Sequence, residues 1–264
     1  MKTLPVLMTA SICTRGMKGA CFTDKEREAM YVNSLSYYIV NLLNGTELQI
    51  VFAENSGWNL EALKAQLPPY DPTQIEFISI PVELFDISKG KGYNELLLIN
   101  ETLKYSRFIQ ANGAFFKVTG RYPIYNLAYF LKCASQQIYS NKVSLYADIK
   151  DHSLYDWLRL GWCGHVFECR LFGVDNYYYL NNIAPLYAQC NDYAGALLEN
   201  ILFNYVKTGG GKISLRFKRE PHFGGWEGSN IEAVSFSKEQ DSLKGKVKRL
   251  VGNAIRMFFP FFYF

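Results

Sequence analysis

The sequence lacks the signals of several common protein classes. Its six cysteines form no close CxxC pair, and no histidine–cysteine spacing matches a zinc site. No apolar run reaches the roughly 18 residues that a membrane-spanning helix needs. The first twelve residues do not have the pattern of a secretory signal. These absences predict free thiols in a reducing cytoplasm.

Charge of one sign is also scarce, because the net charge of +4 on 264 residues is only a mild basic excess. Such an excess gives no argument for nucleic acid as a partner. The hydrophobic content of 49% and the charged content of 20% are typical of a globular protein. No internal repeat or low-complexity linker divides the chain, so we expect one continuous domain.

Strand-like and helix-like patterns alternate through the first part of the chain. Apolar residues at helical spacing follow Thr23 and Asp24, which are typical N-cap residues. The expected strands span residues 4–12, 47–53, 74–80, 114–118 and 143–147, and the expected helices span 24–43, 59–67, 93–105 and 123–137. This alternation predicts an α/β fold with a mostly parallel sheet flanked by helices. The less regular second part predicts strands at 157–172 and 212–217 and helices at 181–190 and 192–207.

Polar and glycine-containing segments stand at the ends of the predicted strands. Ligands of open α/β sheets bind beyond the carboxyl ends of the strands. The candidates are Thr9 and Ser11, then Glu54, Asn55 and Ser56, then Lys89, Gly90 and Gly92, and finally Lys117, Gly120 and Arg121. The last segment places two cations beside a glycine, which suits a diphosphate or another concentrated anion. Two plainer explanations stay open: a capped turn for the second segment and a solvated strand edge for the last.

A family resemblance rests on these segments. The runs KGKGYNELLLINETLKYS and FFKVTGRYPIYN, with ENSG upstream, resemble bacterial glycosyltransferases of lipopolysaccharide, O-antigen or capsular polysaccharide biosynthesis. That family has a GT-A-like fold, in which a Rossmann-like nucleotide-binding half is merged with an acceptor-binding half. The resemblance is good over residues 4–125 and holds in outline beyond them. It implies one transferase domain at 1–238, divided into a nucleotide-binding half at about 1–125 and an acceptor half at about 126–238.

The resemblance also implies a reaction. The enzyme would be a hexosyltransferase-type glycosyltransferase that moves a sugar from a nucleotide-sugar donor to a lipid-linked glycan of the bacterial surface. Thr9, Ser11, Glu54, Asn55 and Ser56 would line the nucleoside pocket, Lys89, Gly90 and Gly92 would lie near it, and Lys117, Gly120 and Arg121 would lie near the diphosphate or donor sugar.

One departure from the family pattern concerns metal ions. Many GT-A enzymes hold a divalent cation with an Asp-x-Asp at the end of the corresponding strand, where this chain has Lys-Val-Thr-Gly-Arg. A carboxylate pair attracts a metal, whereas two cations neutralise phosphate directly. We therefore expect a metal-independent enzyme. Asp148, Asp151 and His222 are competing candidates for single metal ligands.

An inverting transfer needs a carboxylate that takes the proton from the attacking hydroxyl. The candidates are Glu199, Glu227 and Asp148, with Asp192 as a further carboxylate. Glu199 lies in the apolar run ALLENILF, where burial would raise its pKa; a solvated helix face is the alternative. Trp226 and His222 lie in the same glycine-rich loop as Glu227 and are candidates for binding the acceptor. A retaining transfer would need no dedicated base.

The C-terminal segment, residues 239–264, combines basic residues with a final aromatic cluster. This composition favours an interfacial anchor on the inner face of an anionic membrane over a tail packed on the core, because basic side chains gain little from burial.

Two other functions stay open for the whole protein. One is a non-catalytic carbohydrate- or membrane-binding protein, and the other is a nucleotidyltransferase, which would normally require magnesium.

Overall fold

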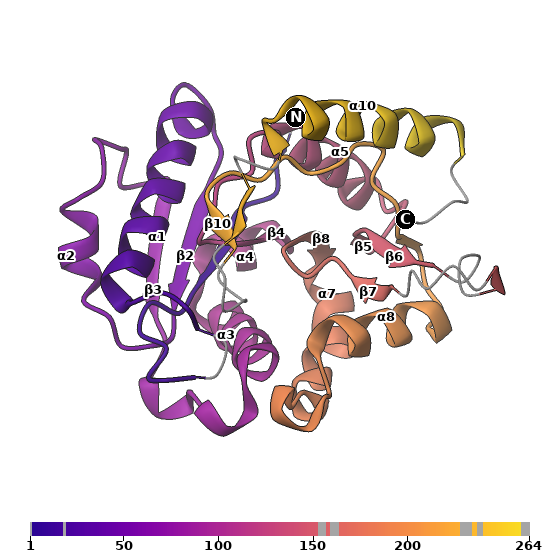
Figure 1. Ribbon diagram of the computed structural model, residues 1–264. Helices are drawn as coiled ribbons and strands as arrows, with labels where there is room; N and C mark the ends of the chain where they lie inside the picture. Colours follow the sequence, from indigo (N-terminus) through magenta and orange to yellow (C-terminus); the bar gives the residue numbers. More distant parts are fainter. Residues whose placement is uncertain are drawn as a thin grey trace.

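The computed structural model describes residues 2–17, 20–152, 157–158, 164–227, 234–236 and 240–259. A seven-stranded sheet with the order β3-β2-β1-β4-β8-β5-β9 forms its centre (Figure 1). The strands are β1 Val6–Ala10, β2 Ile50–Glu54, β3 Ile75–Ser79, β4 Ala114–Thr119, β5 Leu145–Tyr146, β8 Leu171–Asp175 and β9 Ile213–Ser214. Strands β3, β2, β1 and β4 run parallel, β8 runs antiparallel to its neighbours, and β9 is parallel to β5. The predicted fold class, a mostly parallel sheet flanked by helices, is confirmed.

Helices cover both faces of this sheet. The α-helices of the described residues are α1 Asp24–Tyr38, α2 Leu60–Lys64, α3 Lys91–Tyr105, α4 Arg107–Asn112, α5 Leu127–Tyr139, α7 Asn176–Tyr178, α8 Leu198–Thr208 and α10 Leu243–Phe258. Successive residues of a strand point to opposite faces. Accordingly, Met8 of β1 packs in one cluster with Tyr31 of α1 and Phe130 of α5. Leu7 packs in the other cluster with Leu96 of α3 and with α8.

Two small antiparallel sheets lie outside the central one. The first pairs β6 Ile149–Asp151 with β7 His165–Phe167, and the second pairs β10 Trp226–Glu227 with β11 Val234–Ser235. The β6–β7 hairpin follows β5 in the chain and forms its own two-stranded sheet next to the central one. It forms part of the site described below. Part of the strand expected at 157–172 is found in β7 and β8, and residues 159–163 lie outside the described residues.

The largest differences from the expected helices lie in the second half. The segment expected as a helix at 192–207 begins with a 3₁₀ turn, Asp192–Ala194, and α8 starts only at Leu198. Asn191 explains the break, because its side chain accepts hydrogen bonds from the backbone N–H groups of Tyr193 and Ala194. Gly195 then adopts a left-handed conformation with φ of 79°.

The segment expected as a helix at 181–190 is also irregular. It consists of a π-helical turn, Tyr179–Ile183, and a 3₁₀ helix, Ala184–Gln189, with Pro185 in its first turn. Proline has no backbone N–H and is tolerated there, but it interrupts a continuous α-helix. The helix expected at 123–137 begins later, at Leu127, because Ile124 forms a β-bridge with Phe223.

The C-terminal helix α10 packs on the body of the molecule, above α5 in the view of Figure 1. The sequence expectation set a membrane segment against a tail that packs on the core, and the helix does contact the core through one face. No helix among the described residues is long and apolar enough to cross a bilayer. Membrane contact by α10 and the domain boundary at residue 239 stay predictions.

Five cysteines lie within the described residues. Cys13, Cys21, Cys133, Cys169 and Cys190 are all free thiols, whereas Cys163 lies outside the described part. Cys169 and Cys190 are buried and Cys21 is exposed. The expected absence of disulfides therefore holds for the cysteines that the structure describes.

Candidate active site

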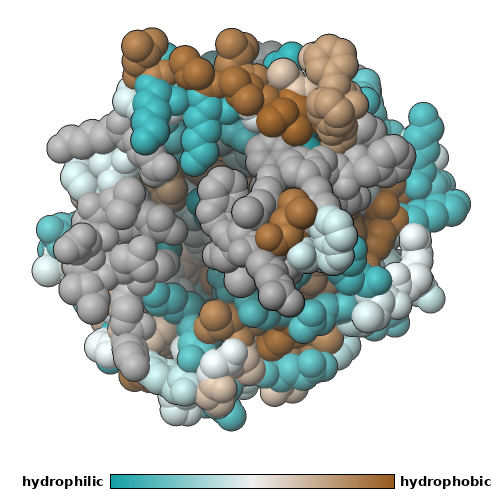
Figure 2. Space-filling model, turned by 45° about the vertical axis from the view of Figure 1, so that its right-hand side comes forward, coloured by the Kyte–Doolittle hydropathy of each residue, from teal (hydrophilic) through white to brown (hydrophobic). Residues whose placement is uncertain are grey.

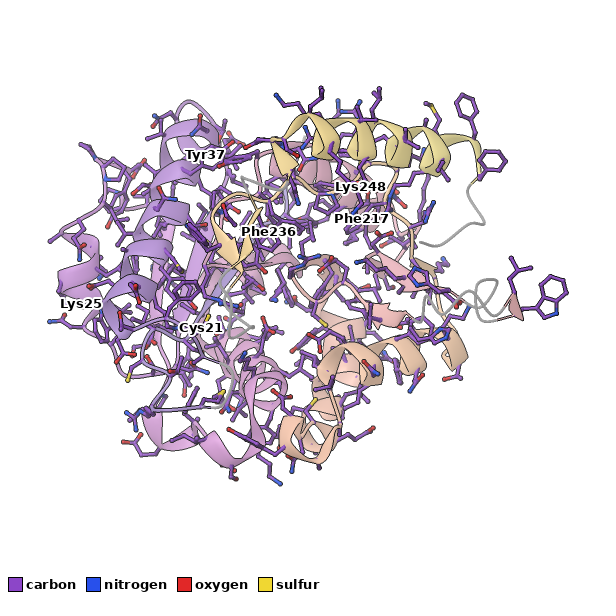
Figure 3. The ribbon with its side chains drawn as sticks, viewed as in Figure 1. Cys21, Lys25, Tyr37, Phe217, Phe236 and Lys248 are labelled. Atoms are coloured by element: carbon purple, nitrogen blue, oxygen red, sulfur yellow. The ribbon has the colours of Figure 1, made fainter. Side chains whose placement is uncertain are left out.

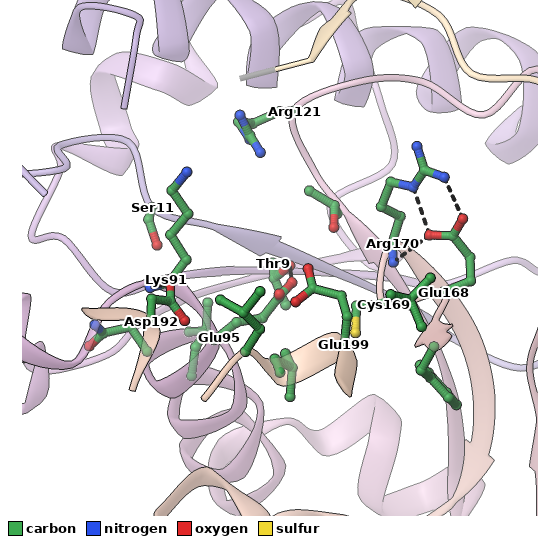
Figure 4. A pocket seen from close by; sticks show the side chains of 18 of the residues that line it. Thr9, Ser11, Lys91, Glu95, Arg121, Glu168, Cys169, Arg170, Asp192 and Glu199 are labelled. Atoms are coloured by element: carbon green, nitrogen blue, oxygen red, sulfur yellow. Dashed lines mark hydrogen bonds and ion pairs between the residues drawn. The ribbon is translucent and has the colours of Figure 1, made fainter. Parts of the chain in front are cut away.

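A cavity of about 720 Å³ opens at the edge of the sheet where β1 and β4 end (Figure 4). Its lining comes from the loop after β1, the inner face of α1, the starts of α3 and α8, the loop after β4 and the β6–β7 hairpin. Thr9, Ser11, Gly92 and Arg121 are the predicted donor-binding residues that line it. A cavity of this size is typical of small-molecule sites, which usually span about 300–1,000 Å³.

Arg27, Lys91 and Arg121 bring positive charge together in this cavity. Burial lowers the pKa of Arg27, and the nearby Arg121 lowers it further. Burial also lowers the pKa of Lys91, and Arg121 and Arg27 add to this effect while Asp192 opposes it. Figure 4 shows Lys91 reaching toward Arg121. The mutual effects on pKa mean that the cations repel one another and that a bound anion would relieve this repulsion.

The three cations differ in how the surrounding structure holds them. Arg27 lies on the buried face of α1, and its Nε donates hydrogen bonds to the carbonyl oxygens of Ser11 (3.1 Å) and Ile12 (3.0 Å). Lys91 is the first residue of α3, and its backbone N–H donates to Oδ2 of Asp192 at 2.6 Å. Arg121 follows β4, and its Nη1 is buried without a hydrogen-bond partner in the described part of the chain. A buried donor of this kind is costly unless a ligand accepts from it.

Lys117 has a different role from the predicted one. Its side chain is only 1% exposed and it does not line the cavity. It forms an ion pair with Glu95, and its Nζ donates to Oγ1 of Thr119 at 3.0 Å and to the carbonyl oxygen of Cys169 at 2.6 Å. Oγ1 of Thr9 also donates to Glu95, at 3.1 Å. The predicted contact between Lys117 and a phosphate is therefore corrected to an ion pair that joins the buried Lys117 to Glu95 in the cavity lining.

Glu54, Asn55 and Ser56 are likewise buried behind the cavity and do not line it. The Glu54 carboxylate accepts from the backbone N–H of Ile12 at 3.2 Å, and Oγ of Ser56 accepts from the N–H of Cys13 at 2.9 Å. Asn55 Oδ1 accepts from Oγ of Ser11 at 2.6 Å. The three residues hold the loop after β1 in place, so their predicted contact with a nucleoside is corrected to a supporting role.

The predicted glycines act through close packing. Gly90 has φ of 86°, and a Cβ there would lie 2.6 Å from Asp192. At Gly120 a Cβ would lie 3.0 Å from the carbonyl oxygen of Thr9, so this glycine lets the loop after β4 pass close to β1. Lys89 ends a 3₁₀ helix and does not line the cavity; the neighbouring Lys91 does.

Two carboxylates that face the cavity differ in their surroundings. Glu199, at the start of α8, points into the cavity in Figure 4. Desolvation by the cavity walls raises its pKa, and Glu95, Asp192 and Glu168 raise it further. Burial would also raise the pKa of Glu168, but the adjacent Arg170 guanidinium, whose Nε donates at 2.6 Å, holds it below its usual value. Of these two carboxylates, Glu199 is therefore the better proton acceptor, because its surroundings favour the protonated form.

The remaining predicted catalytic and acceptor residues lie elsewhere or are already engaged. Asp148 borders the cavity but is buried in an ion pair with Arg256 of α10, which corrects its predicted role as a base. His222 contacts Asp241 at 3.0 Å and the ring of Tyr125, and it does not line the cavity. Trp226 lies in β10, also outside the lining. Glu227 is the other residue of β10, and its side chain lies outside the described part.

No group of three or more His, Cys, Asp and Glu side chains in the described residues is arranged to hold a metal ion. Asp151, a predicted competing ligand, pairs with Lys207 at 2.8 Å and contacts His165 at 3.3 Å. Metal independence stays a prediction.

The sequence expectations missed Arg27, Lys91, Glu95 and Arg170. Arg27 shares a helix face with Tyr31 and Leu35 at a spacing of four, so an arginine among apolar residues was the available signal. Lys91 lies between two glycines that were singled out. No sequence signal marks Glu95 or Arg170, because their partners come from distant segments.

No protein-family model and no curated protein matches the chain. Several solved structures are similar to it in fold. They include the galactosyltransferase LgtC in complex with donor and acceptor sugar analogues, at 12% identity and a TM-score of 0.48 over 82% of this chain and 74% of that chain. A putative nucleotide-diphospho-sugar transferase from Desulfovibrio desulfuricans overlaps at 10% identity and a TM-score of 0.46 over 80% and 78% of the two chains. Mouse xyloside xylosyltransferase 1 overlaps at 10% identity and a TM-score of 0.43 over 80% and 84%. Likeness at this level identifies no substrate, so the function is argued from the cavity.

Proposed function

We propose that this protein is a glycosyltransferase that binds the diphosphate of a nucleotide-sugar donor with Arg27, Lys91 and Arg121. The observation that carries the proposal is the grouping of three mutually repelling cations in one cavity, where burial lowers the pKa of Arg27 and Lys91 and Arg121 has an unsatisfied donor. A diphosphate supplies both the charge and the acceptor oxygens that this arrangement needs. The sequence resemblance to glycosyltransferases supports the same assignment.

The same cations account for the leaving group. When the bond between the donor sugar and the diphosphate breaks, negative charge develops on the leaving phosphate oxygen. Fixed guanidinium and ammonium groups stabilise that charge without moving. We propose on this basis that the enzyme works without a metal ion.

Glu199 is the proposed general base for an inverting transfer. The acceptor hydroxyl oxygen would attack the anomeric carbon while its proton passes to the Glu199 carboxylate, and the electron pair of the broken bond would stay on the diphosphate. The raised pKa of Glu199 suits this proton transfer. In the described part of the chain Glu199 has no ion-pair partner.

The acceptor and its setting are finer parts of the proposal. We propose a hexosyl donor and a lipid-linked bacterial surface glycan as acceptor, reached at the inner face of a membrane. The support is the family resemblance and the surface of α10 described below.

Donor binding tests the proposal. Calorimetry with a panel of nucleoside diphosphates and nucleotide sugars, in excess EDTA, is expected to show binding by the native protein. Arg121→Gln and Lys91→Gln should each weaken it about 10- to 100-fold, because each removes a charged hydrogen-bond donor. Arg219→Gln and Lys218→Gln make the same charge changes at exposed positions outside the cavity lining and should leave binding unchanged.

Four results would count against the proposal or against one part of it. Absence of binding by every nucleotide tested would remove the donor site. Binding that is unaffected by the cavity variants would place the site elsewhere. Nucleotide binding without transfer to any acceptor would favour the non-catalytic alternative, and turnover that disappears in EDTA would remove the metal-independent mechanism.

A further inference from the structure

Helix α10 carries its apolar side chains on the outside of the molecule. Figure 2 shows a run of apolar side chains along the upper edge, where α10 lies in Figure 1. On an α-helix, residues at spacings of three, four and seven share a face. The exposed apolar residues of this face are Leu243, Val247, Leu250, Val251, Met257 and Phe258. Leu243 is 81% exposed and Leu250 and Phe258 are each 71% exposed, so the body of the protein does not cover this face.

The opposite face of α10 is polar and attaches the helix to the body. The Arg256 guanidinium is buried and donates to both carboxylate oxygens of Asp148, at 3.0 Å and 2.9 Å, and to the carbonyl oxygen of Phe217 at 3.0 Å. Phe217 lies below α10 in the view of Figure 3. Oδ1 of Asn253 accepts from the backbone N–H of Glu220 at 2.8 Å. The usual orientation of a surface helix, with its apolar face inward, is therefore reversed.

Close contact at Gly252 confirms which face is inside. A Cβ at Gly252 would lie 2.2 Å from Oε1 of Glu220, so the end of the Glu220 side chain packs directly against this face of α10. Polar bonds and this close approach orient the helix, and its apolar face remains free for another contact. Apolar surface this continuous on an exposed helix indicates an interaction site.

The charge around the apolar face indicates which kind of partner can bind there. Lys244, Lys246 and Lys248 are exposed beside it, and the helix contains no Asp or Glu. A second copy docking through the same face would bring these like charges together, which disfavours self-association. Long lysine side chains beside an apolar face suit a surface that is apolar inside and negatively charged outside.

We propose that the outer face of α10 docks on an anionic lipid bilayer, with the helix lying in the plane of the interface. This proposal adds a lipid class and a docking surface to the proposed function. It depends on that function only for the reason why the protein would dock on a membrane. Asp148 both borders the cavity and holds Arg256, so the docked helix would keep the active-site cavity at a fixed orientation to the membrane. A lipid-linked acceptor would then reach the cavity from the surface on which the enzyme lies.

Vesicle co-sedimentation of the full chain tests this surface. We expect binding to vesicles that contain phosphatidylglycerol and weaker binding to phosphatidylcholine alone. The triple variant Leu243→Ser, Leu250→Ser and Phe258→Ser should weaken binding to the anionic vesicles at least about tenfold, because apolar burial drives interfacial docking. The matched control, Tyr177→Ser with Leu180→Ser, removes exposed apolar side chains from another surface and should bind as the native protein does.

The lysines should account for the lipid preference. Changing Lys244, Lys246 and Lys248 to Gln is expected to remove the difference between anionic and neutral vesicles, and added salt should reduce binding of the native protein. Circular dichroism of each variant checks that α10 and the fold persist.

Three outcomes would overturn the inference. They are failure of the native protein to bind either vesicle, binding that the triple serine variant retains, and a dimer in solution that the same variant dissociates. The last result would assign the face to a second copy of the chain. Donor binding measured on the same samples separates this test from that of the proposed function, because the vesicle assay does not depend on turnover.

Discussion

The floor and the wall of the cavity contain the same kinds of charged side chain, but the two regions differ in how these side chains are paired. On the floor, the buried Lys117 forms an ion pair with Glu95, whose side chain lines the cavity. On the wall, Arg27 and Arg121 have no carboxylate partner in the described residues, and Glu199 faces the cavity with a raised pKa. Charge alone therefore does not identify the functional residues. A charged group that lacks a neutralising neighbour and is open to the cavity is the better candidate for binding a ligand.

Glu199→Gln should give the largest effect on activity and separates the two regions most clearly. Loss of a general base typically lowers the rate about 10²–10⁴-fold, so turnover should fall by that order while donor binding stays near the native value. Glu83→Gln changes an exposed glutamate outside the cavity lining and serves as the control. Steady-state transfer kinetics and calorimetry measure the two quantities. Native turnover in Glu199→Gln would return the choice of base to the other carboxylates or indicate a retaining reaction.

The same variant should be more stable than the native protein at neutral pH. A carboxyl whose pKa is raised by folding stabilises the fold at pH values below its unfolded-state pKa, and this contribution is lost as the pH rises through the folded-state pKa. Ionised Glu199 is therefore unfavourable at neutral pH, and glutamine removes that cost. We expect Tm of Glu199→Gln to exceed the native Tm at pH 7.5 and the difference to shrink toward pH 5. A difference that does not depend on pH would contradict the raised pKa.

Substitution of a charged residue on the floor should lower the stability of the fold. Lys117→Met leaves Glu95 without its partner, and breaking a buried ion pair typically costs about 3–5 kcal/mol. We expect a loss near the lower limit, because the Glu95 side chain is 25% exposed. Arg121→Met should change the free energy of unfolding by less than about 1 kcal/mol, since no partner is left behind. Urea unfolding of both variants tests the distinction.

The double variant Lys117→Met with Glu95→Gln provides the control for this pair. It removes both charges and should recover part of the stability lost in Lys117→Met. Equal losses from Lys117→Met and Arg121→Met would mean that the floor and wall cations do not differ in the way proposed.

The sequence could predict the site as far as strand order and strand ends determine it. Thr9, Ser11 and Arg121 follow from the rule that ligands bind at the carboxyl ends of parallel strands, and all three line the cavity. Lys117 was misplaced because β4 is a central strand whose residues are buried on both faces. A lysine inside such a run needs a buried partner, and the sequence does not show that α3 brings Glu95 against it.

The orientation of α10 could be predicted only in part. The basic and aromatic composition favoured a membrane anchor over a tail packed on the core, but it did not show how the body holds the helix. Its composition shows an amphipathic helix, and the usual rule would turn the apolar face toward the core. Which face of the helix lies inside depends on the groups of the body that it contacts. Here Asp148, Phe217 and Glu220 form hydrogen bonds with the polar residues Arg256 and Asn253. Those partners come from segments distant in the sequence, so only the folded structure shows the reversal.

The smallest expected effect concerns the residues that support the loop after β1. Ser56→Ala removes the acceptor of the Cys13 N–H and should cost about 1–2 kcal/mol of stability, as for other buried hydrogen bonds. Donor affinity should fall less than about threefold, because Ser56 lies behind the loop and the wall cations are unchanged. Ser11→Ala, which alters the loop side chain that does line the cavity, is the matched comparison. If Ser56→Ala weakened donor binding about as much as Arg121→Gln does, the supporting residues would share the function of the wall, and the division between support and contact would have to be redrawn.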